Sequence, residues 1–159
     1  MKCLIFSDSH GNPFYMKRAI DRNPDAEVIF FLGDGISDAE ALAIDDKCRM
    51  WIAVKGNCDF SSFFCNRPLN KTEEITLEAK KIMITHGDVY GVKGGLENLS
   101  IAARSRGADI VLFGHTHMPH ESFCDGLYLF NPGSISKPQY SFGVLTITEK
   151  GALLSHGAV

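Results

Sequence analysis

The sequence predicts an α/β fold in a single domain, residues 1–159. Short apolar runs recur along the chain with helix signals between them, and strands that alternate with helices are typical of an α/β sheet. The length allows one sizeable core but not two independent ones. The composition, with 45% hydrophobic and 22% charged residues, is that of a folded globular chain.

Five apolar runs predict the central strands. Each is short, rich in Ile, Val, Leu and Phe, and lacks strict alternation of polar and apolar residues. Strands that are covered on both faces have this pattern, so we expect interior strands. The runs are residues 3–6, 28–32, 50–54, 82–85 and 110–113.

Helix signals lie between these runs. Asn12 can cap a helix that has Pro13 at its first position and ends before Pro24. A second helix is expected from about residue 36, where Ser37 and Glu40 have the spacing of a capping box. These two helices would connect the first three strands.

The second half of the chain predicts one more helix and three hairpins. Leu96, Leu99 and Ala103 form an apolar stripe on a helix that stops near Gly107. Turn residues separate pairs of strand-like segments, which adds antiparallel strands and gives the α/β class an α+β character. The pairs are residues 74–80 with 81–85, 122–124 with 127–130, and 143–148 with 152–155.

Seven metal-binding side chains follow directly after the five central runs. Ligands gather at the carboxyl ends of strands in α/β sheets, so these side chains are expected to converge. Oxygen and imidazole donors without thiolate suit Mn, Fe, Zn, Co or Ni. Singly, the aspartate motifs are more typical of turns, and the last histidine pair is equally explained by a structural role. The set is Asp8, His10, Asp34, Asn57, His86, His115 and His117.

Charge and cysteine content constrain the partners and the location. The net charge is -3 and the basic residues are scattered, which argues against a nucleic-acid polymer but allows a small anionic substrate. Five cysteines without close pairs, behind an N-terminus without a secretion signal, favour a reducing cytoplasmic location. No apolar run approaches the roughly 20 residues of a membrane span, so no membrane is expected.

Five motifs, taken together, resemble the calcineurin-like metallophosphoesterase superfamily. They are Asp8-Ser9-His10, Gly33-Asp34, Gly56-Asn57-Cys58-Asp59, Thr85-His86-Gly87 and Gly114-His115-Thr116-His117. The resemblance extends from residue 1 to about residue 135, and the cysteine in the third motif and the Asn131-Pro132-Gly133-Ser134 turn resemble the small prokaryotic phosphodiesterase branch. This branch implies a four-layer αββα sandwich of two mixed β-sheets flanked by helices.

The resemblance also implies residue roles. One divalent ion would be held by Asp8, His10, Asp34 and His117, and a second by Asp34, Asn57, His86 and His115, with Asp34 bridging them. Manganese is expected first, with Ni, Co, Zn and Fe as alternatives. A hydroxide that bridges the two ions would attack a small phosphodiester in line. A phosphomonoesterase is the nearest alternative, and a catalytically weak scaffold that resembles a retromer subunit is another. The branch is also compatible with a small homo-oligomer.

Cys58 departs from the superfamily pattern and joins Asn57 and His86 as a candidate catalytic residue. Most members have a histidine at this position, which is thought to assist the leaving group. A thiol is a weak donor, so good leaving groups should be preferred; the alternative is an inert buried cysteine. Asp59 is expected to anchor the loop, and His120 and His156 to be structural or solvent-facing.

Aromatic residues follow this loop at Phe60, Phe63 and Phe64. Core packing is the preferred interpretation because aromatic side chains tend to be buried. A pocket wall or a subunit contact is the alternative.

Overall fold

The computed structural model describes all 159 residues and contains two five-stranded sheets. The first sheet consists of β1 (Lys2–Phe6), β2 (Val28–Phe31), β3 (Met50–Ala53), β11 (Ser141–Thr148) and β12 (Gly151–Ala158). Its strand order is β12-β11-β1-β2-β3. The three early strands run parallel, whereas β11 is antiparallel to both of its neighbours. All three early strands were predicted.

The second sheet consists of β6 (Thr72–Leu77), β7 (Lys80–Thr85), β8 (Ile110–Phe113), β9 (His120–Cys124) and β10 (Leu127–Asn131). Its strand order is β6-β7-β8-β10-β9. The strands β7, β8 and β10 are parallel, and an antiparallel strand lies at each edge. Both sheets are therefore mixed, as expected.

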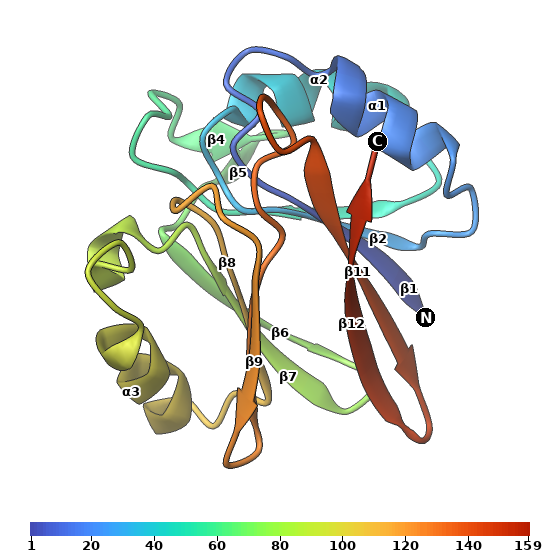
Figure 1. Ribbon diagram of the computed structural model, residues 1–159. Coiled ribbons are helices and arrows are strands. Elements are labelled where there is room, and N and C mark those ends of the chain that lie inside the picture. The colour runs from blue at the N-terminus through green and yellow to red at the C-terminus, as the bar shows by residue number, and fades with distance from the viewer.

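Helices cover the outer faces of the two sheets (Figure 1). The helices α1 (Phe14–Asp21) and α2 (Ile36–Asp45) pack on the first sheet, and α3 (Glu97–Ser105) packs on the second. A short 3-10 helix, η1 (Asp88–Tyr90), precedes α3. The αββα sandwich is confirmed. The longest helix has 10 residues, and none could cross a membrane.

The core between the sheets explains why the central strands are continuously apolar. Along β1, Cys3 and Ile5 belong to the core between the sheets, whereas Leu4 and Phe6 belong to the core under α1 and α2. Neither face meets water, so no position of the strand favours a polar residue. Burial raises the pKa of the Cys3 thiol to about 12, which keeps it protonated and unreactive.

The first helix lies where the sequence predicted it. Pro13 has helical φ and ψ angles of -74° and -11° directly before α1. The side-chain oxygen of Asn12 accepts a hydrogen bond from the backbone N–H of Phe14, at 3.2 Å. The helix ends at Asp21, before Pro24.

The capping box predicted for the second helix is wrong. The helix α2 begins at Ile36, so Ser37 lies inside its first turn and makes no cap. The N–H groups of Gly35 and Ile36 donate instead to the carboxylate of Asp59, at 2.8 and 2.9 Å. Glu40 accepts a backbone N–H from the β4–β5 turn. Any acceptor brought near a helix start can satisfy its free N–H groups, and here a distant loop supplies it.

The predicted hairpins form, with one boundary displaced. The first turn consists of Glu78 and Ala79, both at positive φ, slightly before the predicted boundary. Asp125 and Gly126 connect β9 to β10, and the β11–β12 turn follows Thr148, both as expected.

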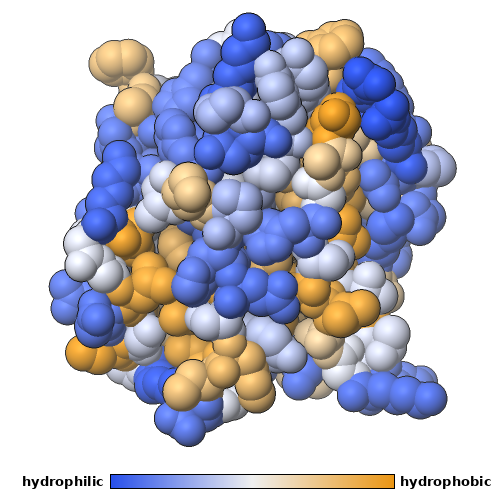
Figure 2. Space-filling view, in the orientation of Figure 1, coloured by the Kyte–Doolittle hydropathy of each residue, from blue (hydrophilic) through white to orange (hydrophobic).

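A small hairpin of β4 (Phe63–Phe64) and β5 (Arg67–Pro68) was not predicted. Core packing is confirmed only for Phe64, which is 6% exposed, and is wrong for Phe60 and Phe63, which are 99% and 56% exposed. Figure 2 shows apolar atoms that project from the surface at the upper left, near the loop to the left of β4 in Figure 1.

Candidate metal centre

The side chains predicted to bind metal follow strands from both sheets. The strands β1, β2 and β3 of one sheet and β7 and β8 of the other each end just before one or two of them. Ligand atoms from six of the seven residues form two compact groups, in each of which the atoms lie within 4.8 Å of one another. The groups are Asp8, His10 and His117, and Asp34, His86 and His115.

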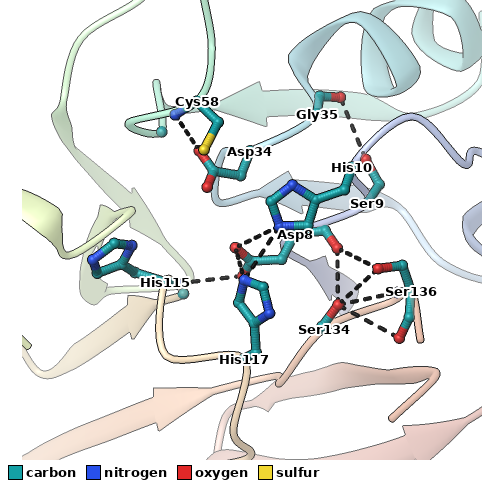
Figure 3. A network of polar contacts seen from close by, with 12 residues as sticks. Asp8, Ser9, His10, Asp34, Gly35, Cys58, His115, His117, Ser134 and Ser136 are labelled. Atoms are coloured by element: carbon teal, nitrogen blue, oxygen red, sulfur yellow. Dashed lines mark hydrogen bonds and ion pairs between the residues drawn. The ribbon is translucent and has the colours of Figure 1, made fainter. Parts of the chain in front are cut away.

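The first group is centred on the Asp8 carboxylate. Its Oδ1 atom lies 3.2 Å from Nε2 of His117 and 3.8 Å from Nε2 of His10. The two imidazole nitrogens are 3.2 Å apart. Figure 3 shows both rings turned toward the carboxylate. Asp8 is fully buried while both histidines are partly exposed, so the group opens to solvent on the histidine side.

The second group surrounds Nε2 of His86. This atom lies 3.4 Å from Oδ2 of Asp34 and 3.1 Å from Nδ1 of His115. The side-chain oxygen of Asn57 is also 3.1 Å away, so Asn57 joins this group. On its other side the His86 ring contacts the carbonyl oxygen of Leu32 at 2.7 Å. A carbonyl only accepts, so Nδ1 carries the proton, and Nε2 of the neutral ring is free as a ligand.

The two groups are adjacent. The backbone N–H of His115, in the second group, donates to Oδ2 of Asp8 in the first, at 3.3 Å (Figure 3). Oδ1 of Asp34 accepts the backbone N–H of Cys58 at 2.8 Å, which directs the other oxygen toward His86. The predicted ligands therefore converge on one region.

The backbone at these residues is unusual. Non-glycine residues rarely adopt positive φ, because Cβ then crowds the backbone. Strain of this kind persists where the surrounding structure imposes it and clusters at functional sites. Five of the seven predicted ligands adopt it: Asp8, His10, Asp34, His115 and His117, with φ between 46° and 67°.

Asp59 holds two of the ligand loops together. Its carboxylate accepts the N–H groups of Asp34 and Gly56, each at 2.8 Å, in addition to the two at the start of α2. The expected role of Asp59 as a loop anchor agrees with these contacts.

Hydroxyl groups hold the Asp8 loop. The backbone oxygen of Asp8 accepts the hydroxyls of Ser134 at 2.8 Å and Ser136 at 3.2 Å (Figure 3). The hydroxyl of Ser9 donates to the Asp38 carboxylate at 2.6 Å. The same Asp38 oxygen accepts the N–H of Gly11, at 2.8 Å. Sequence reasoning missed Asp38 and Ser136, because neither lies in a strand-end motif.

The remaining histidines lie outside both groups. His120 contacts the Ser122 hydroxyl, and His156 donates to the backbone oxygen of Asn131. They have structural contacts, as expected.

The carboxylates of the site attract positive charge. Burial disfavours ionisation of Asp34, but the contact with His86 and the N–H of Cys58 outweigh it and keep the pKa of that carboxyl below its usual range. Burial likewise disfavours protonation of His86, yet the Asp34 and Asp8 carboxylates raise its pKa. Contact with Asp8 raises the pKa of His117, whereas burial and the nearby His86 lower the pKa of His115.

The residues present fit divalent metal ions. Oδ1 of Asp8 is buried and no hydrogen-bond donor satisfies it, which is costly unless a cation takes that position. Ring nitrogens that face each other at 3.1 to 3.2 Å also need a proton or a cation between them. Carboxylate and imidazole donors match the preferences of transition-metal ions.

Cys58 lies at the edge of this centre. It is exposed, so the interpretation as a buried inert cysteine does not fit its position. Its Sγ atom contacts the side-chain amide of Asn57 at 3.3 Å. Contact with the Asp34 carboxylate raises the pKa of the thiol, which therefore stays protonated at neutral pH.

A two-sheet sandwich that gathers carboxylate and imidazole groups at its strand ends has the architecture of a metal-binding hydrolase. The family model for the calcineurin-like phosphoesterase superfamily domain matches residues 1–150. The chain therefore belongs to the calcineurin-like phosphoesterase superfamily, a family of phosphoester hydrolases that implies divalent metal ions.

Relatives and solved structures agree with this assignment. The chain is 34% identical to the probable metallophosphoesterase YsnB of Bacillus subtilis, over 96% of this chain and 88% of YsnB. It is 28% identical to the phosphodiesterase YfcE of Escherichia coli, over 91% and 87%. A predicted phosphoesterase from Streptococcus pneumoniae has a similar structure, with a TM-score of 0.80 and 25% identity over 99% and 88%.

A zinc complex of Vps29 from Entamoeba histolytica is also similar, with a TM-score of 0.73 and 25% identity over 99% of this chain and 98% of Vps29. The same fold therefore occurs in a protein whose name does not describe a phosphoesterase. The fold alone does not specify the reaction.

Proposed function

We propose that this chain is a phosphodiesterase that hydrolyses a small phosphodiester with two divalent metal ions bound. The adjacency of the two donor groups carries the proposal, because two-metal hydrolases need two cations about 3.5–4 Å apart. The similarity to the phosphodiesterase YfcE supports the diester as substrate. The net charge of -3 and the scattered basic residues favour a small ester over a nucleic-acid polymer.

The proposed ligands divide between the two ions. The donor groups and the adjacent Asn57 support this division. Asp34 bridges the ions, and manganese is the proposed metal, with Ni, Co, Zn and Fe as alternatives. Asp8, His10, Asp34 and His117 hold one ion, and Asp34, Asn57, His86 and His115 hold the other.

Two bound ions would activate a water molecule as nucleophile and withdraw charge from the phosphate oxygens. The protein orients the ligands: Leu32 sets the His86 tautomer, and the N–H of Cys58 orients Asp34. Cys58 is the residue proposed to face the leaving group. Its weak thiol donor favours substrates whose leaving groups need little protonation.

The test is a metal and substrate survey of the purified chain. Protein stripped with a chelator should bind two ions and should cleave a chromogenic bis-aryl phosphodiester faster than the aryl monoester. The ions Mn, Ni, Co, Zn and Mg are compared. Asp34→Asn protein, purified in the same way, is the control for a contaminating phosphatase. A faster monoester reaction would favour a phosphomonoesterase. Two bound ions without turnover by any metal would contradict the enzyme proposal and favour the catalytically weak scaffold.

We further propose that residues 1–159 act as one domain. The family match to residues 1–150 supports this.

The cysteines, none of which is in a disulfide, support a reducing cytoplasmic setting. A homo-oligomer stays a prediction, and light scattering of the purified chain would test it.

A further inference from the structure

Two ligands proposed for the same ion come from different sheets. Asn57 follows β3 of the first sheet, and His86 follows β7 of the second. Metal binding needs ligand atoms held to within about 0.5 Å of the productive geometry. Strands of separate sheets share no backbone ladder, so some other contact has to set the distance between the two loops.

Lys71 lies between these loops. Its Nζ atom donates to the carbonyl oxygen of Gly56 at 3.1 Å and to Oδ2 of Asp88 at 2.8 Å. Gly56 directly precedes Asn57, and Asp88 follows His86 by two residues. One ammonium group thus links the loop that carries Asn57 to the loop that carries His86.

The backbone around Lys71 is fastened to the same two segments. The carbonyl oxygen of Lys71 accepts the hydroxyl of Thr85 at 2.9 Å, next to His86. The preceding residue, Asn70, accepts the N–H of Lys55 at 2.9 Å, close to Gly56. The ammonium group is therefore presented from a segment that is itself tied to both sheets.

The two partners of Lys71 have few alternative contacts in the ligand loops. A side chain on Gly56 would collide with the Asp34 carboxylate, so Gly56 packs directly against another proposed ligand. The other oxygen of Asp88 is buried and has no hydrogen-bond partner, which makes Lys71 the main compensation for that carboxylate. The pair itself is partly exposed, with side-chain exposures of 38% for Lys71 and 17% for Asp88. Pairs of this kind add little to folding stability.

We propose that Lys71 is a positioning residue for one metal ion, because its contacts with Gly56 and Asp88 hold Asn57 and His86 at bonding distance from a shared cation. This inference rests on the proposed function, which assigns both ligands to the same ion. The ion at Asp8, His10 and His117 lies outside the linked loops and should depend less on Lys71.

The test is calorimetric titration of chelator-stripped protein with Mn²⁺. In Lys71→Met the affinity for one of the two ions should fall about 10- to 100-fold, the range typical of outer-shell partners. The other affinity should stay within about twofold. Asp88→Asn, which removes the charge that Lys71 pairs with, should act in the same direction. Lys2→Met is the matched control, because Lys2 forms a similar partly exposed pair with Asp25, at 2.9 Å, away from the site.

The possible results separate the two proposals. Wild-type protein that binds two ions while both variants match it would overturn the positioning role and leave the proposed function standing. Equal loss of both ions together with a lower unfolding temperature of the metal-free variants would also overturn it, since Lys71 would then stabilise the fold in general. Wild-type protein that binds fewer than two ions would overturn the proposed function, and this inference with it.

Discussion

The ring of His86 donates its Nδ1–H to the carbonyl oxygen of Leu32, 2.7 Å away. His86 follows β7 of one sheet, and Leu32 follows β2 of the other. Leu32 lies two positions before Asp34, so this bond joins the loops of two proposed ligands of the same ion. It resembles the arrangement in which a metal-binding histidine is oriented by a backbone carbonyl.

Asp34→Asn should reduce the affinity for both metal ions. The substitution keeps the shape of the side chain but removes the charge that a bridging ligand shares between two cations. We expect kcat/KM for a bis-aryl phosphodiester to fall by more than the roughly 10- to 100-fold typical of outer-shell partners. Metal titration and steady-state kinetics measure both effects. Asp8→Asn is the comparison and should weaken one ion mainly; full activity of Asp34→Asn would show that the bridge assignment is wrong.

Cys58→His should extend activity to esters with poorer leaving groups. An imidazole is a better proton donor than a thiol, and general acid catalysis contributes about 10²- to 10⁴-fold when the group is well placed. The dependence of rate on leaving-group pKa should become shallower, as measured with a series of substituted aryl diesters. Cys48→Ser, at another exposed cysteine, is the control. An unchanged profile would mean that Cys58 takes no part in catalysis.

Asp59→Ala should destabilise the fold as well as the site. The carboxylate accepts four backbone N–H groups, and all of these hydrogen bonds involve a charged partner. The loss should be about 3 kcal/mol or more, since each such bond is worth about 1.5–3 kcal/mol and the four are not additive. Urea denaturation measures it. Asp25→Asn, at an exposed carboxylate, should change stability far less; equal effects would contradict the anchoring role.

Asp46 should contribute a pH-dependent part of the stability. Burial disfavours its ionisation, but the side chains of Trp51 and Arg49 donate to it at 3.1 Å, and together with the N–H of Cys48 they lower its pKa. Because the native pKa lies below the unfolded value of about 3.9, this stability is present above that value and is lost as pH falls through the native pKa.

Urea denaturation between pH 7 and pH 3 tests this, and fluorescence of Trp51, the single tryptophan, reports the local change. Asp46→Asn should be less stable than wild type at pH 7, and the difference should shrink in acid. A difference independent of pH would contradict the role of the charge.

Much of the candidate site could be predicted because its information is local. Asp8, Asp34 and His86 each stand directly after an apolar strand, and parallel strands bring their carboxyl ends together. The capping of α2 could not be predicted in the same way. Ser37 and Glu40 satisfy a local pattern, but the acceptor that the helix uses comes from a different loop.

The central strands, their apolar character and the family motifs all followed from residues near one another in the chain, since strand burial and motif spacing are properties of short segments. Only the tertiary structure decided which residues hold the ligand loops: Asp59 at the start of α2, and Lys71 between Gly56 and Asp88. It also decided that Phe60 is exposed beside a buried Phe64. A free N–H, a carbonyl or an aromatic face can be satisfied by any group that the fold brings near it, and sequence separation does not limit which group that is.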